Sequence, residues 1–155
     1  MKLRLLAVGE RPRSWVMDGF NDYARRLPRE SELSLVEVAA GAGKGRPPER
    51  TRADQARRLL RQLGQNDWVV ALDCGGAACT TQQLAAKLEH WRVQGRDVAF
   101  LVGGADGLDA SCLSRADEVM SLSKLTFPHE LVRVILAEQI YRAWTILSRH
   151  PYHRA

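Results

Sequence analysis

The chain has 155 residues, enough for one domain with a core of its own, and its hydrophobic fraction of 45% is ordinary for a globular protein. That composition excludes a disordered chain, and the apolar runs are too short to cross a membrane. No small-residue cleavage site follows the apolar N-terminus, so we expect a cytoplasmic protein with no membrane partner. The formal net charge of +5 favours an anionic partner such as nucleic acid.

Two residue types refine this picture. Arginine provides 19 of the 23 basic residues, which suits two-point contacts to phosphate, although a coding bias toward arginine would give the same excess. The three cysteines, Cys74, Cys79 and Cys112, are odd in number and lack the spacing of a disulfide framework, and no second Cys or His pair completes a zinc site. We therefore expect reduced cysteines and no metal.

Strands and helices alternate from the N-terminus onward. Residues 2–8 have the alternation of a strand. A helix follows, with Ser14 as its N-cap and apolar positions that recur every 3.6 residues as far as Leu27. Residues 33–38 form the second expected strand, so the pattern is that of a layered α/β fold.

A basic segment rich in glycine and proline, AAGAGKGRPPER, comes next. It lacks the residue order of a P-loop. It therefore either contacts phosphate, with Lys44, Arg46 and Arg50 as candidates, or serves only as a connection. Residues 50–63 predict an amphipathic, arginine-rich helix that ends at Gly64.

The second half continues the alternation with more strongly apolar strands. Residues 67–73 and 97–102 are almost wholly apolar, as in a sheet covered on both faces. Between them, Thr80 and Gln83 form a capping box for a helix that runs to about Gln94. A short helix, a strand and a long helix follow, at residues 109–115, at residues 118–121 and after Pro128.

The expected fold is a single α/β domain over residues 1–155, with a mostly parallel sheet and helices on both faces. In such sheets, ligands bind at the carboxyl ends of the strands. Three segments rich in glycine and small residues lie at those ends: LDCGGAA, VGGADGL and SLSKLTFPHE. This coincidence predicts a ligand site there.

None of these segments has a nucleotide-binding fingerprint of its own. The first strand is not followed by G-x-G-x-x-G, and Gly103, Gly104 and Gly107 could simply form a tight turn. The segment 122–127 is uncharged except for Lys124, and its main chain can hydrogen-bond the edge of a planar heterocycle.

Taken together, LVGGADGL, SLSKLTFPHELVRVILAEQIYRAW and the terminal HPYHR resemble the ribosomal RNA large subunit methyltransferase H family of SPOUT methyltransferases, and the resemblance covers essentially the whole chain. It implies an α/β fold with a C-terminal trefoil knot, S-adenosylmethionine as cofactor and a homodimer. It also implies methylation at N3 of a pseudouridine in 23S rRNA of the assembled ribosome. Carried over residue by residue, the cofactor site falls on Leu72, Gly103, Leu122, Ser123, Lys124, Leu125, Thr126 and Phe127.

Three residues are candidates for the base that would remove the N3 proton. His129 follows Pro128 at a helix N-terminus, where the dipole favours a neutral imidazole, although it could equally cap the helix. Glu138 lies in an apolar helix one turn from Arg142, so an internal ion pair is its simpler interpretation. His153, in the C-terminal tail, is the third.

The tail itself carries useful chemistry. Tyr152, His153 and Arg154 can stack on a base, exchange a proton and hold a phosphate. Pro151 ends the helix, and such a chain end is mobile on its own, so a frayed tail is the alternative. The resemblance favours a functional tail that completes the partner subunit's site.

The long helix is apolar over too wide an arc for one stripe. It either packs on the sheet with one side and on a second copy with the other, or is enclosed within one domain. Arg133 and Arg142 on this helix are further candidate phosphate contacts. Two alternative functions remain open: another SPOUT methylation, of a tRNA ribose 2′-O or guanosine N1, and a non-catalytic dimeric RNA-binding module.

Overall fold

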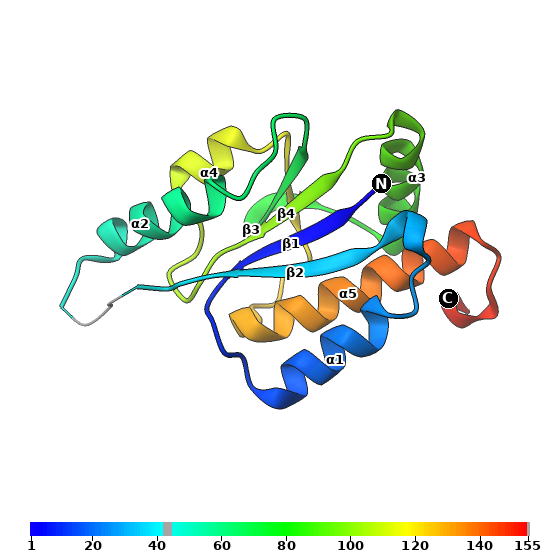
Figure 1. Ribbon diagram of the computed structural model, residues 1–155, viewed down its shortest axis with the longest axis horizontal. Coiled ribbons are helices and arrows are strands. Elements are labelled where there is room, and N and C mark those ends of the chain that lie inside the picture. Colours follow the sequence, from blue (N-terminus) through cyan, green and yellow to red (C-terminus); the bar gives the residue numbers. More distant parts are fainter. Residues whose placement is uncertain (42–44, 155) are drawn as a thin grey trace.

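The structure, a computed structural model, describes residues 1–41 and 45–154. At its centre lies a five-stranded sheet in the order β2-β1-β4-β3-β5, and all neighbouring strands are parallel (Figure 1). The strands are β1 (Leu3–Val8), β2 (Leu33–Val38), β3 (Trp68–Ala78), β4 (Val98–Val102) and β5 (Glu118–Ser121). The expected α/β class is confirmed, whereas the trefoil knot stays a prediction because strand order alone does not say how the chain is threaded.

Helices cover both faces of this sheet. On one face α5 packs against both α1 and α3, and the other face carries α2 and α4 (Figure 1). The helices are α1 (Ser14–Ala24), α2 (Pro48–Leu60), α3 (Thr81–Gln94), α4 (Ala110–Arg115) and α5 (His129–Leu147), with short 3₁₀ turns η1 (Arg29–Ser31) and η2 (Pro151–His153). Within residues 1–41 and 45–154, no helix is long and apolar enough to cross a membrane.

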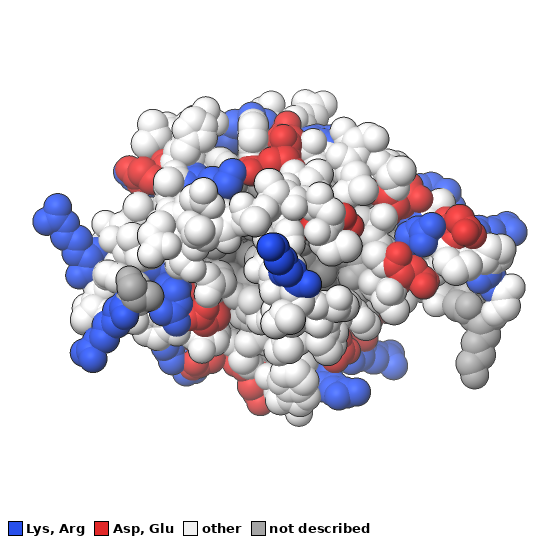
Figure 2. Space-filling model, turned by 180° about the vertical axis from the view of Figure 1, so that it is seen from behind, with Lys and Arg blue, Asp and Glu red and all other residues white. Residues whose placement is uncertain are grey.

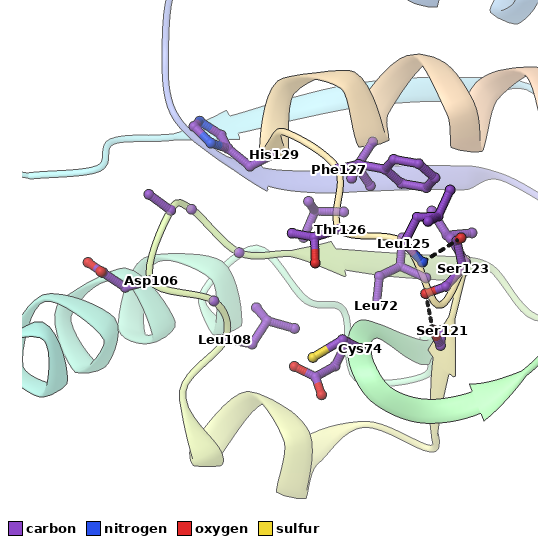
Figure 3. A pocket seen from close by; sticks show the side chains of 18 residues that line it. Leu72, Cys74, Asp106, Leu108, Ser121, Ser123, Leu125, Thr126, Phe127 and His129 are labelled. Atoms are coloured by element: carbon purple, nitrogen blue, oxygen red, sulfur yellow. Dashed lines mark hydrogen bonds between the residues drawn. The ribbon is translucent and has the colours of Figure 1, made fainter.

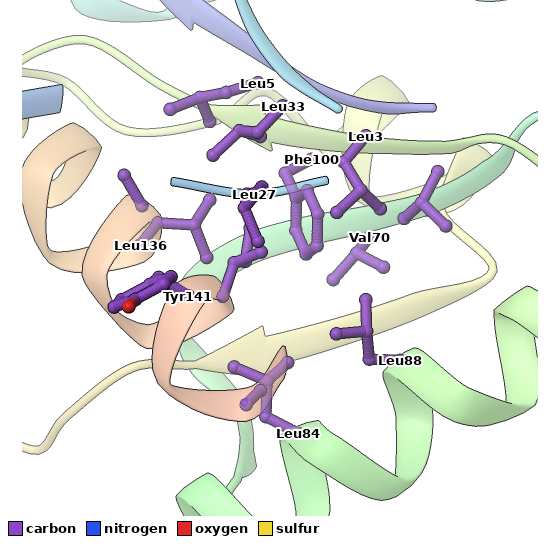
Figure 4. Packing of buried hydrophobic residues seen from close by; sticks show 14 of the residues in the cluster. Leu3, Leu5, Leu27, Leu33, Val70, Leu84, Leu88, Phe100, Leu136 and Tyr141 are labelled. Carbon is purple, nitrogen blue, oxygen red and sulfur yellow. The ribbon is translucent and has the colours of Figure 1, made fainter. Parts of the chain in front are cut away.

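Alternation along the strands divides the core into two clusters. On β1 and β4, Leu3, Leu5 and Phe100 belong to the cluster under α1, α3 and α5, which Figure 4 shows. Leu6 and Leu101 belong to the cluster under α2 and α4. Because helices cover both faces, all five residues of β4 are buried, which explains the continuous apolar run in the sequence.

The third strand is longer than the sequence predicted. After an irregularity between Leu72 and Ala77, the last two residues of β3 pair with β5. Gly76 permits this close approach, because a Cβ there would lie 2.7 Å from the backbone nitrogen of Met120. The segment expected to be a loop is therefore a bulged strand pressed against β5.

Two helix starts show one correct and one wrong prediction. The capping box at α3 is confirmed: Thr80 Oγ1 accepts from the Gln83 N–H at 3.1 Å, and Gln83 Oε1 accepts from the Thr80 N–H at 2.8 Å. Ser14 is not the N-cap of α1. Arg13 occupies that position without a side-chain cap bond, and Ser14 is the first helical residue.

A buried arginine joins the ends of β1 and β2 to α5. Arg133 is 1% exposed, donates to the carbonyl oxygens of Val8 at 3.1 Å and Gly9 at 2.7 Å, and pairs with Glu37 of β2 at 3.0 Å. Its assignment as a phosphate contact is wrong, because protein encloses the side chain. Arg133 instead fixes the β1 and β2 ends against the first turns of α5.

We predict that Arg133→Met destabilises the fold by about 3 kcal/mol, because two carbonyl groups and one carboxylate lose their donor. Urea denaturation measures the change. Arg61→Met, at an exposed position after α2, is the control and leaves the midpoint nearly unchanged. Equal midpoints for the two variants would contradict the anchoring role of Arg133.

Cys112 offers a test of burial on the α2 and α4 side of the sheet. Burial, and to a lesser extent the Asp109 carboxylate, raises the pKa of its thiol from 9.0 to about 11. As the pH rises, the thiol loses its proton in the unfolded chain before it does so in the folded protein. Cys112 therefore makes its whole contribution to the free energy of unfolding below pH 9, and this contribution is lost as the pH rises toward 11.

We predict that the unfolding free energy of the wild type falls more steeply between pH 9 and 11 than that of Cys112→Ala, by roughly 2 kcal/mol over the interval. Urea titrations at each pH give the two slopes. Cys74→Ala, which changes an exposed thiol, keeps the wild-type slope. Parallel curves for wild type and Cys112→Ala would be the contrary result.

Candidate functional site

A cavity of about 370 Å³ opens where the carboxyl ends of β3, β4 and β5 meet the start of α5 (Figure 3). Its walls come from the bulged part of β3, the glycine-rich segment 103–108 after β4, the segment 121–127 after β5, and the first two turns of α5. The parallel sheet brings these distant segments together, as expected from the strand ends.

Most of the residues carried over from the family resemblance line this cavity. They are Leu72, Gly103, Leu122, Ser123, Leu125, Thr126 and Phe127, joined by the candidate base His129 (Figure 3). Lys124 belongs to the same segment, but its side chain is exposed and does not line the cavity.

Close backbone contact shapes the segment after β4. A Cβ on Gly103 would lie 2.5 Å from the backbone carbon of Gly107, and Gly107 itself has a φ of 80°. The Gly107 N–H donates to the carbonyl oxygen of Gly104 at 3.0 Å, which closes the turn. Glycine at 103 is thus required for the chain to fold back here, so the tight-turn interpretation is correct, and the turn forms one wall of the cavity.

Side-chain hydroxyls hold the segment after β5 in a compact turn. Ser121 Oγ donates to the carbonyl oxygen of Ser123 at 3.0 Å, and Ser123 Oγ accepts from the Leu125 N–H at 2.9 Å (Figure 3). These local bonds fix an uncharged main chain along one side of the cavity. Leu125 is 73% exposed at its rim.

Sequence reasoning missed several residues of the wall. Asp73, Cys74, Asp106 and Leu108 line the cavity but were not assigned to the cofactor site. All four belong to LDCGGAA or VGGADGL, the segments that the sequence placed at the carboxyl ends of strands, so their positions were a usable signal. Asp73 and Asp106 give the cavity wall its negative charge. Among the described lining residues they are the acidic ones, and none of these residues is Lys or Arg.

His129 begins α5 at the edge of the cavity, after Pro128 in the N-cap position. Its Nε2 atom lies 4.0 Å from the place that a Cβ on Gly9 would take. Arg133, one turn further along α5, holds the Gly9 carbonyl. The end of β1 therefore packs beside the imidazole, and the histidine is part of the site.

The C-terminal tail packs on α5 and does not line the cavity. Tyr152 donates its hydroxyl to Glu138 at 3.0 Å, and Arg142 pairs with the same carboxylate at 2.6 Å. The Arg142 guanidinium also donates to the His153 carbonyl at 3.3 Å. Burial, and then hydrogen bonding with Tyr23 and to the Glu138 carboxylate, raises the pKa of Tyr152, which keeps its hydroxyl a donor.

Two sequence hypotheses are decided by these contacts. The ion pair between Glu138 and Arg142 is confirmed. The alternative of a frayed tail is wrong, because the Tyr152 ring packs at a tilt against Tyr141, with ring centroids 4.7 Å apart. Lys44, a candidate phosphate contact, lies outside the described residues. In the part of the chain that is described, no group of three or more His, Cys, Asp or Glu side chains could hold a metal ion.

Comparison with known proteins gives the family. The family model described as predicted SPOUT methyltransferase matches residues 1–153. The chain belongs to the SPOUT methyltransferases. Among its SPOUT relatives, a ribosomal RNA large subunit methyltransferase H of Methylococcus capsulatus is 53% identical across 99% of this chain and 100% of that protein. The protein of the same name from Xanthomonas axonopodis pv. citri is 52% identical across 100% of each.

A solved structure agrees at the level of fold. A probable methyltransferase from Bordetella pertussis Tohama I has a TM-score of 0.58 to this chain, covering 91% of this chain and 95% of that one. Its sequence is only 14% identical, so this likeness concerns the architecture alone. The family resemblance noted in the sequence is confirmed.

We predict that Gly103→Ala lowers the affinity for S-adenosylmethionine at least about tenfold, because the added methyl group would displace the backbone of Gly107 and deform the cavity. Calorimetric titration measures the affinity. Gly19→Ala on α1 is the control: the nearest atoms to its added methyl group would belong to the Val134 side chain, which does not line the cavity. Wild-type affinity in Gly103→Ala would show that the cofactor does not depend on this turn.

Proposed function

We propose that this chain uses S-adenosylmethionine to methylate large-subunit ribosomal RNA, at N3 of a pseudouridine in 23S rRNA of the assembled ribosome. One observation carries the proposal: the cavity at the strand ends lies in a chain about half identical, over its full length, to proteins named ribosomal RNA large subunit methyltransferase H. Residues 1–155 act as a single domain. The enzyme works as a homodimer in the cytoplasm, where ribosomes are found.

The cavity suits this cofactor in size and charge. Its volume of about 370 Å³ fits a small-molecule site. Of the described residues that line it, Asp73 and Asp106 are acidic and none is Lys or Arg, which favours a ligand with a sulfonium and an ammonium group. Leu72, Gly103 and the segment 122–127 would hold it through their main chain. When bound, the cofactor supplies an already activated methyl group.

The protein must therefore position the RNA base and remove its N3 proton. Among the three candidate bases, His129 lines the cavity, whereas Glu138 is engaged by Arg142 and Tyr152 further along α5. A base has to reach the proton that it removes, so geometry favours His129. Glu138 instead anchors the tail.

The tail acts in the partner's site. Tyr152 is held at Glu138, nine residues from His129 and thus about 13 Å along the helix axis. His153 and Arg154 therefore stay away from the cavity of their own subunit, and none of the tail residues lines it. A second copy that brings its tail to this cavity would supply Tyr152, His153 and Arg154 for base stacking, proton exchange and phosphate binding.

Mixing two inactive variants tests this arrangement. Gly103→Ala damages the cofactor cavity and leaves the tail intact, whereas His153→Ala does the reverse. If tails act in the partner's site, mixed dimers contain one complete site, and an equimolar mixture recovers about a quarter of wild-type methylation. If each tail serves its own subunit, the mixture stays inactive. Rapid methyl transfer by isolated His153→Ala would contradict a role for the tail.

The substrate is tested with tritiated S-adenosylmethionine on whole ribosomes and on protein-free 23S rRNA from a strain that lacks this chain. We expect methylation of the whole ribosome, with the product mapped to N3 of a pseudouridine by mass spectrometry. Removal of Tyr152 to Ala155 should abolish methylation and leave calorimetric cofactor binding nearly intact. Methylation of tRNA in place of rRNA would overturn the assignment.

A further inference from the structure

Nearly all of the chain's net positive charge lies on one segment. Residues 46–61, which contain α2, carry six arginines against two carboxylates, so they account for +4 of the formal net charge of +5. The remainder of the chain is close to neutral. In Figure 2, blue side chains project at the right-hand edge, the end of the molecule that holds α2, together with some red ones; blue side chains also project at the left-hand edge, and one lies over the centre of that face.

Folding does not require all of these arginines. The inner side of α2 buries Gln55, Ala56 and Leu59 against the sheet. Arg52 lies on this same side, one turn before Gln55 and Ala56, and is partly buried, whereas the other five arginines of the segment lie outside the inner stripe. Arg46 and Arg57 share one carboxylate, Asp54. Two charges thus converge on a single partner, which leaves the outer surface positive.

One unpaired charge lies near each end of α2. Arg50 and Arg61 are exposed, and neither has an ion pair among residues 1–41 and 45–154. An unpaired surface arginine is ready for phosphate, because no internal salt bridge has to break first.

The inner side of α2 contacts the segment after β4 that forms one wall of the cavity. Arg52 donates to the carbonyl oxygen of Asp106 at 3.5 Å, and Gln55 lies 3.6 Å from the place that a Cβ on Gly104 would take. Asp106 and Gly104 both line the cavity. α2 therefore stands directly beside the cavity wall, so RNA bound along its outer side would run about one helix diameter, roughly 10 Å, from that wall.

We propose that the outer side of α2, with Arg50 and Arg61 as its free charges, binds the phosphate backbone of the rRNA that flanks the target nucleotide. The inference rests on the proposed function, since it supplies the RNA-binding surface for that site. Binding of this kind is dominated by electrostatics, so it holds the RNA in place without reading its sequence.

The test compares two double variants with the same change in net charge. Arg50→Gln with Arg61→Gln alters the α2 surface. Arg25→Gln with Arg92→Gln alters two exposed arginines on the opposite face of the sheet, the first directly after α1 and the second in α3. Binding to ribosomes and to a protein-free 23S rRNA fragment is measured at several salt concentrations, together with the KM for ribosomes and the affinity for S-adenosylmethionine.

We expect the α2 variant to weaken RNA binding and raise the KM about tenfold, and to reduce the slope of log affinity against log salt by about 0.7 for each lost contact. Its cofactor affinity stays at the wild-type value, and the control variant behaves as wild type. Equal effects in both variants would overturn the assignment of the surface. An effect on ribosomes without any effect on free RNA would also overturn it, because the partner would then be a ribosomal protein.

The same measurements separate this inference from the proposed function. If the wild-type protein methylates no rRNA, the proposed function fails. If the wild type is active and the α2 variant retains its KM and salt slope, the α2 proposal alone fails.

Discussion

Backbone contact without intervening side chains shapes the candidate site. At Gly103 the chain folds so closely onto Gly107 that a methyl group would lie 2.5 Å from a backbone atom, and at Gly76 the bulged part of β3 meets β5 at a similar separation. Such contacts bring three connecting segments within reach of one ligand. The parallel sheet sets the direction of these segments, and the glycines allow them to converge.

The general position of the site could be predicted from the sequence, because it depends only on the spacing of apolar residues and on the order of strands and helices along the chain. Buried strands appear as apolar runs, helices as 3.6-residue patterns, and parallel strands place their carboxyl ends at one edge. The glycines of VGGADGL were therefore correctly placed at the edge of the sheet where the cavity opens. The bulge of β3 could not be predicted in this way, because pairing with β5 depends on a contact between segments more than 40 residues apart.

Charged residues were harder to place than apolar ones. Arg133 looked like a surface cation, yet it is enclosed by the carbonyl groups of Val8 and Gly9 and by Glu37. The tail looked mobile, yet Tyr152 is fixed by Glu138 and Tyr141. Both outcomes depend on partners that are distant in sequence, and a local pattern carries no information about them. The same contacts separate the roles along α5, with His129 at the cavity and Glu138 holding the tail.

Amide hydrogen exchange with and without S-adenosylmethionine tests most directly whether these converging segments hold the methyl donor. We predict that added cofactor slows exchange in residues 103–108 and 121–127, with little change in α1 and α2. Slowed exchange confined to other segments, in a protein that binds the cofactor, would contradict this account of the site.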